Sequence, residues 1–161
     1  MALIEIDGSQ GEGGGQVLRT ALTLSLATGR AFRMDRVRVS RERPGLMRQH
    51  LTCVRAAKAI GGARVRGDEL GSTEISFAPS RLDPGEYRFA IGTAGSALLV
   101  LQAVLPALLV AGGPSRLELE GGTHNHFALP WDFFAHAHAP FLERMGARVR
   151  TELGRAGFYP A

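Results

Sequence analysis

The sequence carries the same succession of elements twice, and this internal repeat constrains the fold more than any single motif. ALIEID (2–7) alternates apolar and polar residues as a strand does, and GSQGEGGG (8–15) is a glycine-rich loop. QVLRTALTLSLATG (16–29) then has apolar residues at helical spacing. The order returns in YRFAIGTAGS (87–96), a strand with a glycine-containing loop, and in the apolar helix after it. The two copies are offset by roughly 83 residues.

Each copy is predicted to run strand, helix, strand, helix and then further strands. In the first copy, FRMDRVRV (32–39) is predicted as a strand, followed by a helix to about Ile60 and by strands in ARVRG and TEISFA. In the second, RLELE (116–120) is predicted as a strand and residues 131–149 as a helix leading into a strand. Such a unit places two helices on one face of a small sheet. The predicted class is α+β, with repeated units of two helices packed on a four-stranded sheet.

The repeat divides the chain into two units and the start of a third. Repeat 1 is expected at about residues 1–80, repeat 2 at about 81–152, and repeat 3 from about 153 to 161. Because GFYPA at the end follows an apparent third restart, we expect the chain to be a fragment of a longer protein.

Composition permits an anionic partner. The chain has 161 residues and a formal net charge of +4, and Lys58 is its single lysine, so arginine supplies almost all the positive charge. The planar guanidinium suits phosphates and carboxylates, which allows a nucleotide or nucleic-acid ligand. Genome composition or heat adaptation would explain the same bias equally well.

Several features indicate a cytoplasmic protein. Cys53 is the one cysteine, so no disulfide can form within the chain. MALIEIDGSQ lacks a basic region followed by an apolar run, so no secretory signal is expected. The longest apolar stretch, residues 98–111, is too short to cross a bilayer and contains Gln102 and Pro106. We expect it to be a buried helix, and we expect no membrane partner.

The glycine-rich loop is a candidate phosphate site that matches neither standard fingerprint. Gly13 is followed by Gly14 where the Walker pattern needs lysine, and Gln16 stands where the dinucleotide pattern needs glycine. A structural turn is therefore an equal alternative. Glu12 could hold Mg²⁺, which binds through one or two carboxylates and substrate phosphates, or could be a solvated loop carboxylate. Arg19, one turn into the next helix, points either to solvent or to an anion at the loop.

The densest basic stretch covers residues 30–48. Alternation would put Arg36 and Arg38 on one face of a strand, with Arg41 in the loop beyond. Such a cluster suits an RNA phosphate or a nucleoside triphosphate, and a solvated strand face is the alternative. The stretch contains seven arginines: Arg30, Arg33, Arg36, Arg38, Arg41, Arg43 and Arg48.

Other polar residues carry weaker signals. Burying the amide of Gln102 without partners would cost about 1–3 kcal/mol, so we expect backbone, a side chain or a ligand to satisfy it. Two histidine pairs, at 124 and 126 and at 136 and 138, lack a third ligand at metal-binding spacing, and we assign no metal to them. No Gly-x-Ser-x-Gly sequence supports a hydrolase triad.

Read together, these segments resemble the RNA 3'-terminal phosphate cyclase family. The resemblance runs from Ile4 to Pro160 and rests on segments in the family's order and spacing. It implies repeated units similar to the C-terminal domain of translation initiation factor three, with a smaller inserted domain beyond residue 161. The segments are IDGSQGEGGGQVLRTALTLSLATG, RPGLMRQHLTCVRAAKAIGGA, LGSTEISFAP, YRFAIGTAGSALLVLQAVLPALL and GGTHN.

The resemblance implies an ATP-dependent activity with an RNA 3'-phosphate as substrate. In this family a histidine attacks the α-phosphate of ATP, AMP passes from that histidine to the RNA 3'-phosphate, and the adjacent 2'-OH closes a 2',3'-cyclic phosphate. These steps need a nucleophile, Mg²⁺ or Mn²⁺, and cations that hold the leaving pyrophosphate. The oligomeric state stays open, a homodimer included.

The resemblance also assigns roles to individual residues. Glu12 matches the family's metal-binding glutamate. Phe133 matches part of the adenine pocket. The family often has Ala-Pro-Pro where this chain has Ala128-Leu129-Pro130, a departure at which Leu129 could still pack on adenine beside Pro130. The residues that match positions around the phosphates of ATP or RNA are Arg19, Arg38, Arg41, Gln49 and, as an ATP contact, Gln102.

The family's adenylated histidine has no counterpart here. It lies near the C-terminus of family members, and no histidine among residues 1–161 matches it, so we expect the nucleophile beyond residue 161 and this chain alone to be inactive. Many members also carry an acid where this chain has His124.

Three alternatives remain. A non-catalytic cyclase-like protein in ribosomal RNA processing would tend to lose Glu12, Arg19, Arg41 and Gln102, all present here. An enolpyruvyl transferase built from the same unit would not explain RPGLMRQH or GGTHN. A plain RNA-binding module would bind with strong salt dependence and no dependence on ATP.

Overall fold

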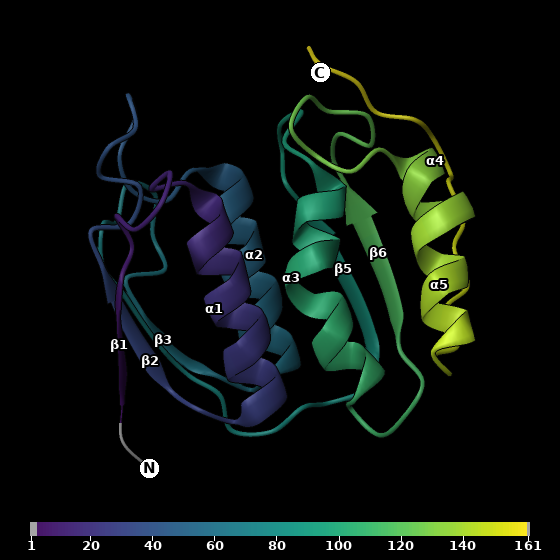
Figure 1. Ribbon diagram of the computed structural model, residues 1–161, viewed down its shortest axis with the longest axis horizontal. Helices are drawn as coiled ribbons and strands as arrows, with labels where there is room; N and C mark the ends of the chain where they lie inside the picture. Colours follow the sequence, from purple (N-terminus) through teal and green to yellow (C-terminus); the bar gives the residue numbers. More distant parts are fainter. Residues whose placement is uncertain (1–2, 161) are drawn as a thin grey trace.

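The computed structural model describes residues 3–160, which form a mixture of strands and helices (Figure 1). The first unit is a four-stranded sheet with two helices, and the second contains two strands and the remaining helices. The elements of the first unit are β1 (Ile4–Asp7), α1 (Gly15–Thr28), β2 (Phe32–Asp35), α2 (Arg48–Ile60), β3 (Arg64–Arg66) and β4 (Ile75–Ala78). Those of the second are β5 (Glu86–Ala90), α3 (Ala97–Leu109), β6 (Arg116–Glu120), α4 (Trp131–Phe133), the π-helical segment η1 (Phe134–His138) and α5 (Ala139–Arg144).

The four-stranded sheet has the order β1-β2-β4-β3. β1 and β2 are parallel, with Ile4 opposite Phe32, whereas β4 runs antiparallel to both of its neighbours. Alternate residues of the sheet are buried under the helices, including Phe32, Met34, Ile75 and Phe77. This is the two-helix, four-stranded unit that the sequence predicts, and the α+β class is confirmed.

α1 forms because apolar residues recur at helical spacing on one face. Leu18, Leu22 and Leu26 are buried, while Leu24 on the opposite face is exposed. The helix ends at Gly29, whose φ of 70° lies in the left-handed region that glycine adopts without strain. The predicted helix terminator is therefore confirmed.

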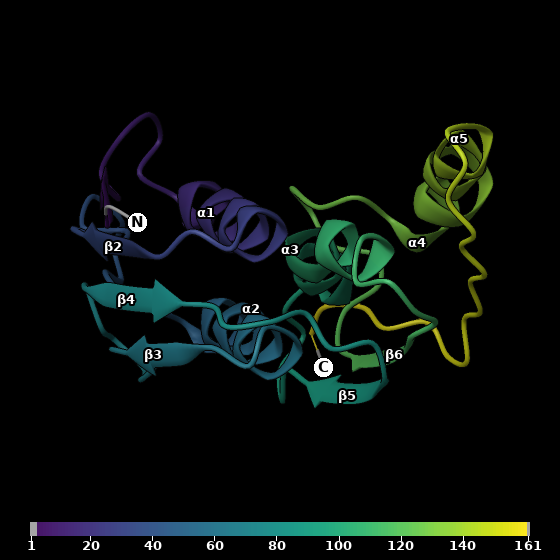
Figure 2. The same ribbon diagram turned by 90° about the horizontal axis from the view of Figure 1, so that it is seen from below.

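α3 is the element that joins the two units. It packs against α1 and α2 on one side and against β6 on the other, so it lies between the first unit and the second (Figure 2). Because it is covered on several sides, its sequence is apolar almost all round, with Val100, Ala103, Val104 and Ala107 fully buried. The apolar helix predicted at 98–111 is confirmed over Ala97–Leu109, and its last residues are exposed.

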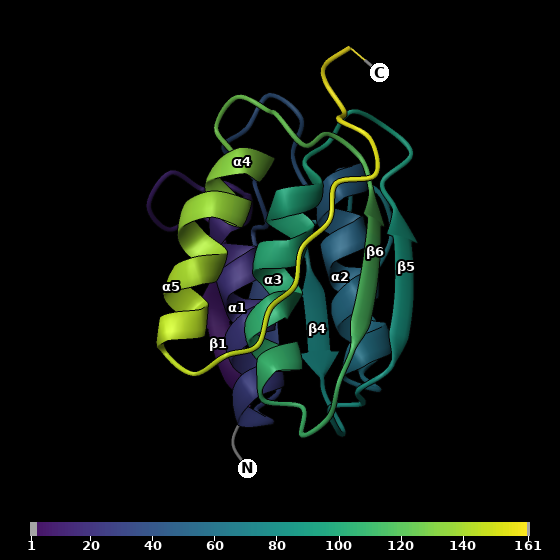
Figure 3. The ribbon, with the colours of Figure 1, turned by 90° about the vertical axis from the view of Figure 1, so that its right-hand side faces the viewer.

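The loops that follow β1, β2, β5 and β6 gather at one end of the molecule. β1 and β2 are parallel, β5 and β6 are parallel, and the helices return antiparallel to them, so the N-termini of α1, α2 and α3 lie at the upper end in Figure 1. Figure 3 shows the loop after β6 and the C-terminal segment at the same end. This end therefore collects glycine-containing loops and helix N-termini from both units.

The predicted strand at 32–39 is too long. β2 ends at Asp35, and Arg36 and Arg38 have φ values of 50° and 55°, which no strand contains. The positive φ angles turn the chain, while Val37 between them stays buried and its N–H bonds to the Thr73 carbonyl (2.9 Å). Arg36 and Arg38 thus do not share a strand face, and that prediction is wrong.

The strand expected after the 131–149 helix is also not formed. The helix ends at Arg144, and no strand is assigned between residues 145 and 160. In the first unit β3 pairs only with β4, and β4 alone connects it to the sheet. The second unit has no counterpart of β4 within residues 3–160, so its β3 counterpart has no neighbour to pair with. The second unit therefore has a two-stranded sheet.

No helix in the described residues is both long and apolar enough to cross a membrane.

Leu22→Ala should lower the free energy of unfolding by about 2–5 kcal/mol, because it removes a fully buried side chain between α1 and its neighbours. Leu24→Ala on the same helix is the matched control, since Leu24 is 56% exposed. It should change stability by no more than about 0.5 kcal/mol. Urea denaturation followed by circular dichroism measures both, and equal losses would contradict the packing of α1 described here.

Candidate functional site

The candidate site lies where the N-termini of α1, α2 and α3 converge. The first N–H groups of a helix lack intrahelical partners and carry partial positive charge, so such ends favour anions. Gly14, Met47 and Ser96 are the N-cap residues of the three helices. Gln49 in the first turn of α2 accepts a hydrogen bond from the N–H of Ser96 (2.7 Å) with its side-chain Oε1, which ties the starts of α2 and α3 together.

Arg19 is buried in α1 and has no carboxylate partner among the described residues. It is 8% exposed, and burial lowers the pKa of its guanidinium. Its Nε donates to Gln102 Oε1 in α3 (3.3 Å) and its Nη2 to Gln16 Oε1 (2.8 Å). Neutral acceptors do not balance the charge, and a buried charge is costly unless it is paired. The site therefore offers a cation suited to an anionic ligand.

Gln102 differs from its predicted environment. Its side chain is exposed, although its helix is otherwise apolar. Gln102 lies on the side of α3 that faces Arg19 of α1, and its amide oxygen is satisfied by that arginine. The expected partner exists, but the burial assumed from the sequence is wrong, since the Gln102 side chain stays exposed beside Arg19.

Glu12 and Arg41 lie together at the glycine-rich loop. Arg41 Nη2 is 3.5 Å from Glu12 Oε2, and the Glu12 side chain is 95% exposed. A Cβ at Gly14 would lie 3.0 Å from Arg41 Nη2, so the missing side chain lets this guanidinium approach the loop. Both side chains are accessible to a ligand at the start of α1.

Arg38 shapes the loop between β2 and α2. Its Nη1 donates to the carbonyls of Arg43 (2.8 Å) and Gly45 (2.7 Å). Burial, and then the nearby charge of Arg41, lower its pKa. Arg38 therefore lies in this loop and not on a strand face, and it makes a loop-positioning contact that the sequence does not reveal.

His50 is a buried member of the site to which the sequence assigns no role. A Cβ at Gly15 would lie 2.3 Å from His50 Nε2, so only glycine allows the imidazole to approach α1 this closely. Burial, then the charges of Arg38 and Arg19, lower the pKa of His50 to about 4. Its Nδ1 accepts from the Met47 N–H (3.3 Å), so the neutral tautomer that fits carries its proton on Nε2. The spacing of His50 with Cys53, Val54 and Ala57 on one helix face is the sequence signal for its burial.

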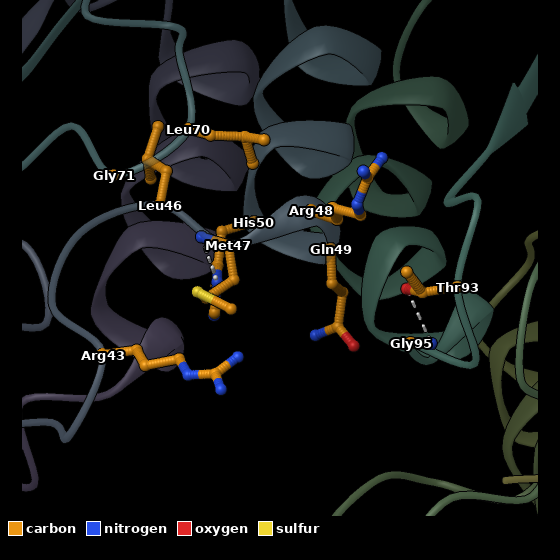
Figure 4. A pocket seen from close by; sticks show the side chains of 10 residues that line it. All are labelled: Arg43, Leu46, Met47, Arg48, Gln49, His50, Leu70, Gly71, Thr93 and Gly95. Carbon is orange, nitrogen blue, oxygen red and sulfur yellow. Dashed lines mark hydrogen bonds between the residues drawn. The ribbon is translucent and has the colours of Figure 1, made fainter. Parts of the chain in front are cut away.

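A hollow of about 520 Å³ adjoins the start of α2 (Figure 4). Gln49 and His50 line it, so it is continuous with the cluster described above. Its other lining residues are Arg43, Leu46, Met47, Arg48, Leu70, Gly71, Thr93 and Gly95.

The expected adenine-contacting residues stand on the segment after β6. Phe133 is half-exposed on α4, Leu129 packs partly against the core, and Pro130 is the N-cap of α4. Asn125 in the same segment donates to the Ala94 carbonyl (2.6 Å), which links the loops after β5 and β6. Within residues 3–160, no hydrogen bond or ion pair joins Leu129, Pro130 or Phe133 to Arg19, Arg38 or Arg41.

Glu12 fits one ligand of a hard divalent cation. Among the described residues, no group of three or more His, Cys, Asp or Glu side chains could enclose a metal. Mg²⁺ commonly binds through one or two carboxylates, water and substrate phosphates. Glu12 is a single accessible carboxylate beside the glycine-rich loop. It fits this mode of binding, in which phosphate oxygens of the ligand and water complete the coordination of the ion.

Comparisons with known proteins show the family of the chain. A sequence model of the family described as "RNA 3'-terminal phosphate cyclase" matches residues 10–161. A protein of that name from Koribacter versatilis is 59% identical over 159 residues, which are 99% of this chain and 45% of the relative. Relatives of the same name from Ralstonia nicotianae (59% over 158 residues, 98% and 46%) and Salmonella agona (58% over 159 residues, 99% and 46%) are similar. The chain belongs to the RNA 3'-terminal phosphate cyclase family, and it spans about half the length of these curated relatives.

Stability should fall on acidification because of His50. Its pKa of about 4 in the folded state lies below the usual 6.5. Between these pH values the unfolded chain binds more protons than the folded chain, so acidification stabilises the unfolded chain relative to the folded one. Stability is therefore present above about pH 6.5 and is lost as the pH falls toward 4, by up to about 3 kcal/mol. His50→Gln, which retains an acceptor and cannot titrate, should show a flatter profile. Urea denaturation of both proteins from pH 7 to pH 4 measures this, and parallel profiles would refute the role of His50.

Proposed function

We propose that the protein provides the phosphate-binding part of an enzyme that converts an RNA 3'-terminal phosphate to a 2',3'-cyclic phosphodiester with ATP. The observation that carries this proposal is Arg19, a buried guanidinium that has no carboxylate partner within residues 3–160 and bonds to Gln102 across the junction of the two units. A polyanion would supply the missing negative charge. Membership of the cyclase family supports ATP and RNA phosphate as the polyanions.

In this proposal the arginines and helix N-termini hold phosphates. Arg19 and Arg41 contact the nucleotide phosphates at the start of α1, with Gln102 orienting Arg19. Arg38 and Gln49 contact phosphates of ATP or RNA at the start of α2. Leu129, Pro130 and Phe133 supply apolar surface for adenine. Fixed cations of this kind stabilise charge that develops when a phosphoryl bond breaks.

Glu12 is the proposed carboxylate for Mg²⁺ or Mn²⁺. The ion would neutralise phosphate charge when bound. The Glu12 carboxylate is accessible and lies 3.5 Å from the Arg41 guanidinium. A divalent cation could take the place of that guanidinium beside the carboxylate. Release of Arg41 from Glu12 would free its guanidinium for the phosphates, so one carboxylate would position both charges.

The proposed reaction proceeds through a histidine adenylate and an RNA adenylate. A histidine attacks the α-phosphate of ATP and pyrophosphate leaves; the RNA 3'-phosphate then takes the AMP; the 2'-OH attacks that phosphate, loses its proton, and AMP leaves. His50 is unsuited as the nucleophile, since it is buried and its Nδ1 accepts from Met47. The nucleophile is proposed to lie beyond residue 161.

Adenylation of the product of the complete gene tests this function. The protein is incubated with α-labelled ATP and Mg²⁺, and the label on protein should be acid-labile and base-stable, as expected of a phosphoramidate. RNA with a 3'-phosphate should then remove the label and become cyclised, whereas matched RNA with a 3'-hydroxyl should not. Absence of label on folded protein that still binds RNA would favour the non-catalytic relative. Labelling of residues 1–161 alone would contradict the proposed position of the nucleophile.

Glu12→Ala should lower the rate of adenylation in Mg²⁺ by at least about tenfold, equal to about 1.4 kcal/mol of activation free energy, because it removes the proposed metal ligand. Glu42→Ala is the matched control, since Glu42 is an exposed carboxylate of the neighbouring loop and forms no ion pair within residues 3–160. Rates measured against metal concentration give the comparison. A normal rate for Glu12→Ala with unchanged metal dependence would exclude the metal role.

A further inference from the structure

The imidazole of His124 joins the loop after β6 to the first turn of α4. Its Nε2 lies 2.7 Å from Asp132 Oδ2. An ionised carboxylate only accepts hydrogen bonds, so Nε2 carries a proton and donates it. This hydrogen bond is the main cause that lowers the pKa of Asp132. On the other edge of the ring, Nδ1 lies 2.9 Å from the Thr123 hydroxyl and can accept from it. Both ring nitrogens therefore have partners.

The C-terminal segment also holds this ring. His124 stacks on Phe158, with 5.0 Å between the ring centroids and 17° between the ring planes. The N–H groups of Thr123 and His124 donate to the Gly157 carbonyl (2.8 and 3.2 Å), and the Gly157 N–H donates to the Thr123 hydroxyl (2.9 Å). A Cβ at Gly157 would lie 2.4 Å from the Gly121 carbonyl oxygen, so only glycine allows this approach. The imidazole is therefore held at both edges and on one face.

A backbone hydrogen bond closes the same loop beside the imidazole. The N–H of Trp131 donates to the Thr123 carbonyl (3.0 Å). Residues 124–131 therefore form a loop whose two ends are joined by one backbone bond and one side-chain bond. α4 begins at Trp131 and contains three residues, and its N-cap makes no side-chain hydrogen bond. The first turn of α4 is thus tied at its start to Thr123 and His124.

The closed loop is joined to the N-terminus of α3. Asn125 Nδ2 donates to the Ala94 carbonyl (2.6 Å), and the N–H of Ala97 donates to the Gly122 carbonyl (2.8 Å). The N-cap residue of α3 in turn bonds to Gln49 of the candidate site. Figure 3 shows the loop leading into α4 at this same end of the molecule. The loop is therefore connected to the end that carries the proposed phosphate contacts.

The closed loop holds the apolar surface that is proposed for adenine. Phe133, in the first turn of α4, is 53% exposed, and Leu129 is partly buried. The faces of a purine are flat and apolar, so its binding depends on how well such side chains are aligned with it. Asp132 directly precedes Phe133 in the chain, so loss of its bond to His124 would release the turn that carries Phe133.

We propose that His124 is a positioning residue for base recognition, which holds Phe133 in place against the adenine of ATP through its bond to Asp132. This proposal rests on the proposed function, because it takes ATP as the ligand. His124 acts through Asp132 and not by contact with the nucleotide. Arg19 and Arg41, the proposed phosphate contacts, lie on α1 and on the loop before α2, so they do not depend on this bond. The contribution of His124 is therefore to binding of the base and not of the phosphates.

Nucleotide binding to the complete gene product tests this role. The first probe is α,β-methylene-ATP with Mg²⁺, because its bridging carbon prevents release of pyrophosphate and isolates binding from turnover. The second probe is inorganic triphosphate, which has no base. His124→Ala and Asp132→Ala should each lower the affinity for the ATP analogue by at least about fivefold and leave the affinity for triphosphate within about twofold. If the unaltered protein binds neither probe, or binds both equally well, the proposal is wrong.

Further variants exclude a general disturbance of the fold. His124→Gln keeps a donor for Asp132, so it should recover most of the affinity that His124→Ala loses. The double variant His124→Ala/Asp132→Ala should lose no more than the larger single loss, because both changes remove the same contact. His126→Ala is the matched control, since His126 is exposed in the same loop and forms no hydrogen bond or ion pair within residues 3–160. Equal losses of affinity for the two probes would overturn the proposal.

Adenylation with labelled ATP separates this inference from the proposed function. In His124→Ala the KM for ATP should rise by at least about fivefold while kcat stays within about twofold, because the lost interaction is common to the ground state and the transition state. If the unaltered protein adenylates and both alanine variants bind the ATP analogue normally, the inference is wrong and the proposed function stands. If the unaltered protein never adenylates but the variants lose affinity for the ATP analogue alone, the proposed function fails and the role of His124 stands.

Discussion

The contact between Arg19 and Gln102 is the interaction on which the site depends. Arg19 belongs to α1 of the first unit and Gln102 to α3 of the second, and their side chains meet at 3.3 Å. The guanidinium is buried, and no carboxylate in residues 3–160 balances it. Folding therefore holds a cation whose side-chain partners are the neutral amides of Gln16 and Gln102. Such an arrangement costs stability, and a bound polyanion would offset that cost.

The topology explains why both units contribute to one site. Two pairs of parallel strands, each joined by an antiparallel helix, direct their following loops to one end. α3 packs on α1 and α2, so the helix N-termini of the two units are adjacent, as the bond from Ser96 N–H to Gln49 records. Glycines at these loops let side chains approach the backbone, as His50 does at Gly15. A single unit would supply only part of this cation-rich end.

Much of the fold could be predicted because its signals are local. Apolar spacing determines α1 and α3, and the left-handed Gly29 marks the end of α1. The extent of β2 is not predictable from alternation, because left-handed backbone at Arg36 and Arg38 ends the strand, and the alternating residues do not signal it. The missing strand of the second unit depends on a partner strand rather than on its own residues. Arg19 and Gln102 were identified through the resemblance, whereas their direct contact, the exposure of Gln102 and the hollow beside His50 arise from helix packing between distant segments.

Amide hydrogen exchange with and without ATP and Mg²⁺ tests the claim of one shared site most directly. If both units bind the same polyanion, ATP should slow exchange together in the loop 8–15, in the start of α2 and in the start of α3. Exchange in the distant strand β3 should stay unchanged. Protection limited to the first unit, or absent from all three segments at saturating ATP, would contradict the account.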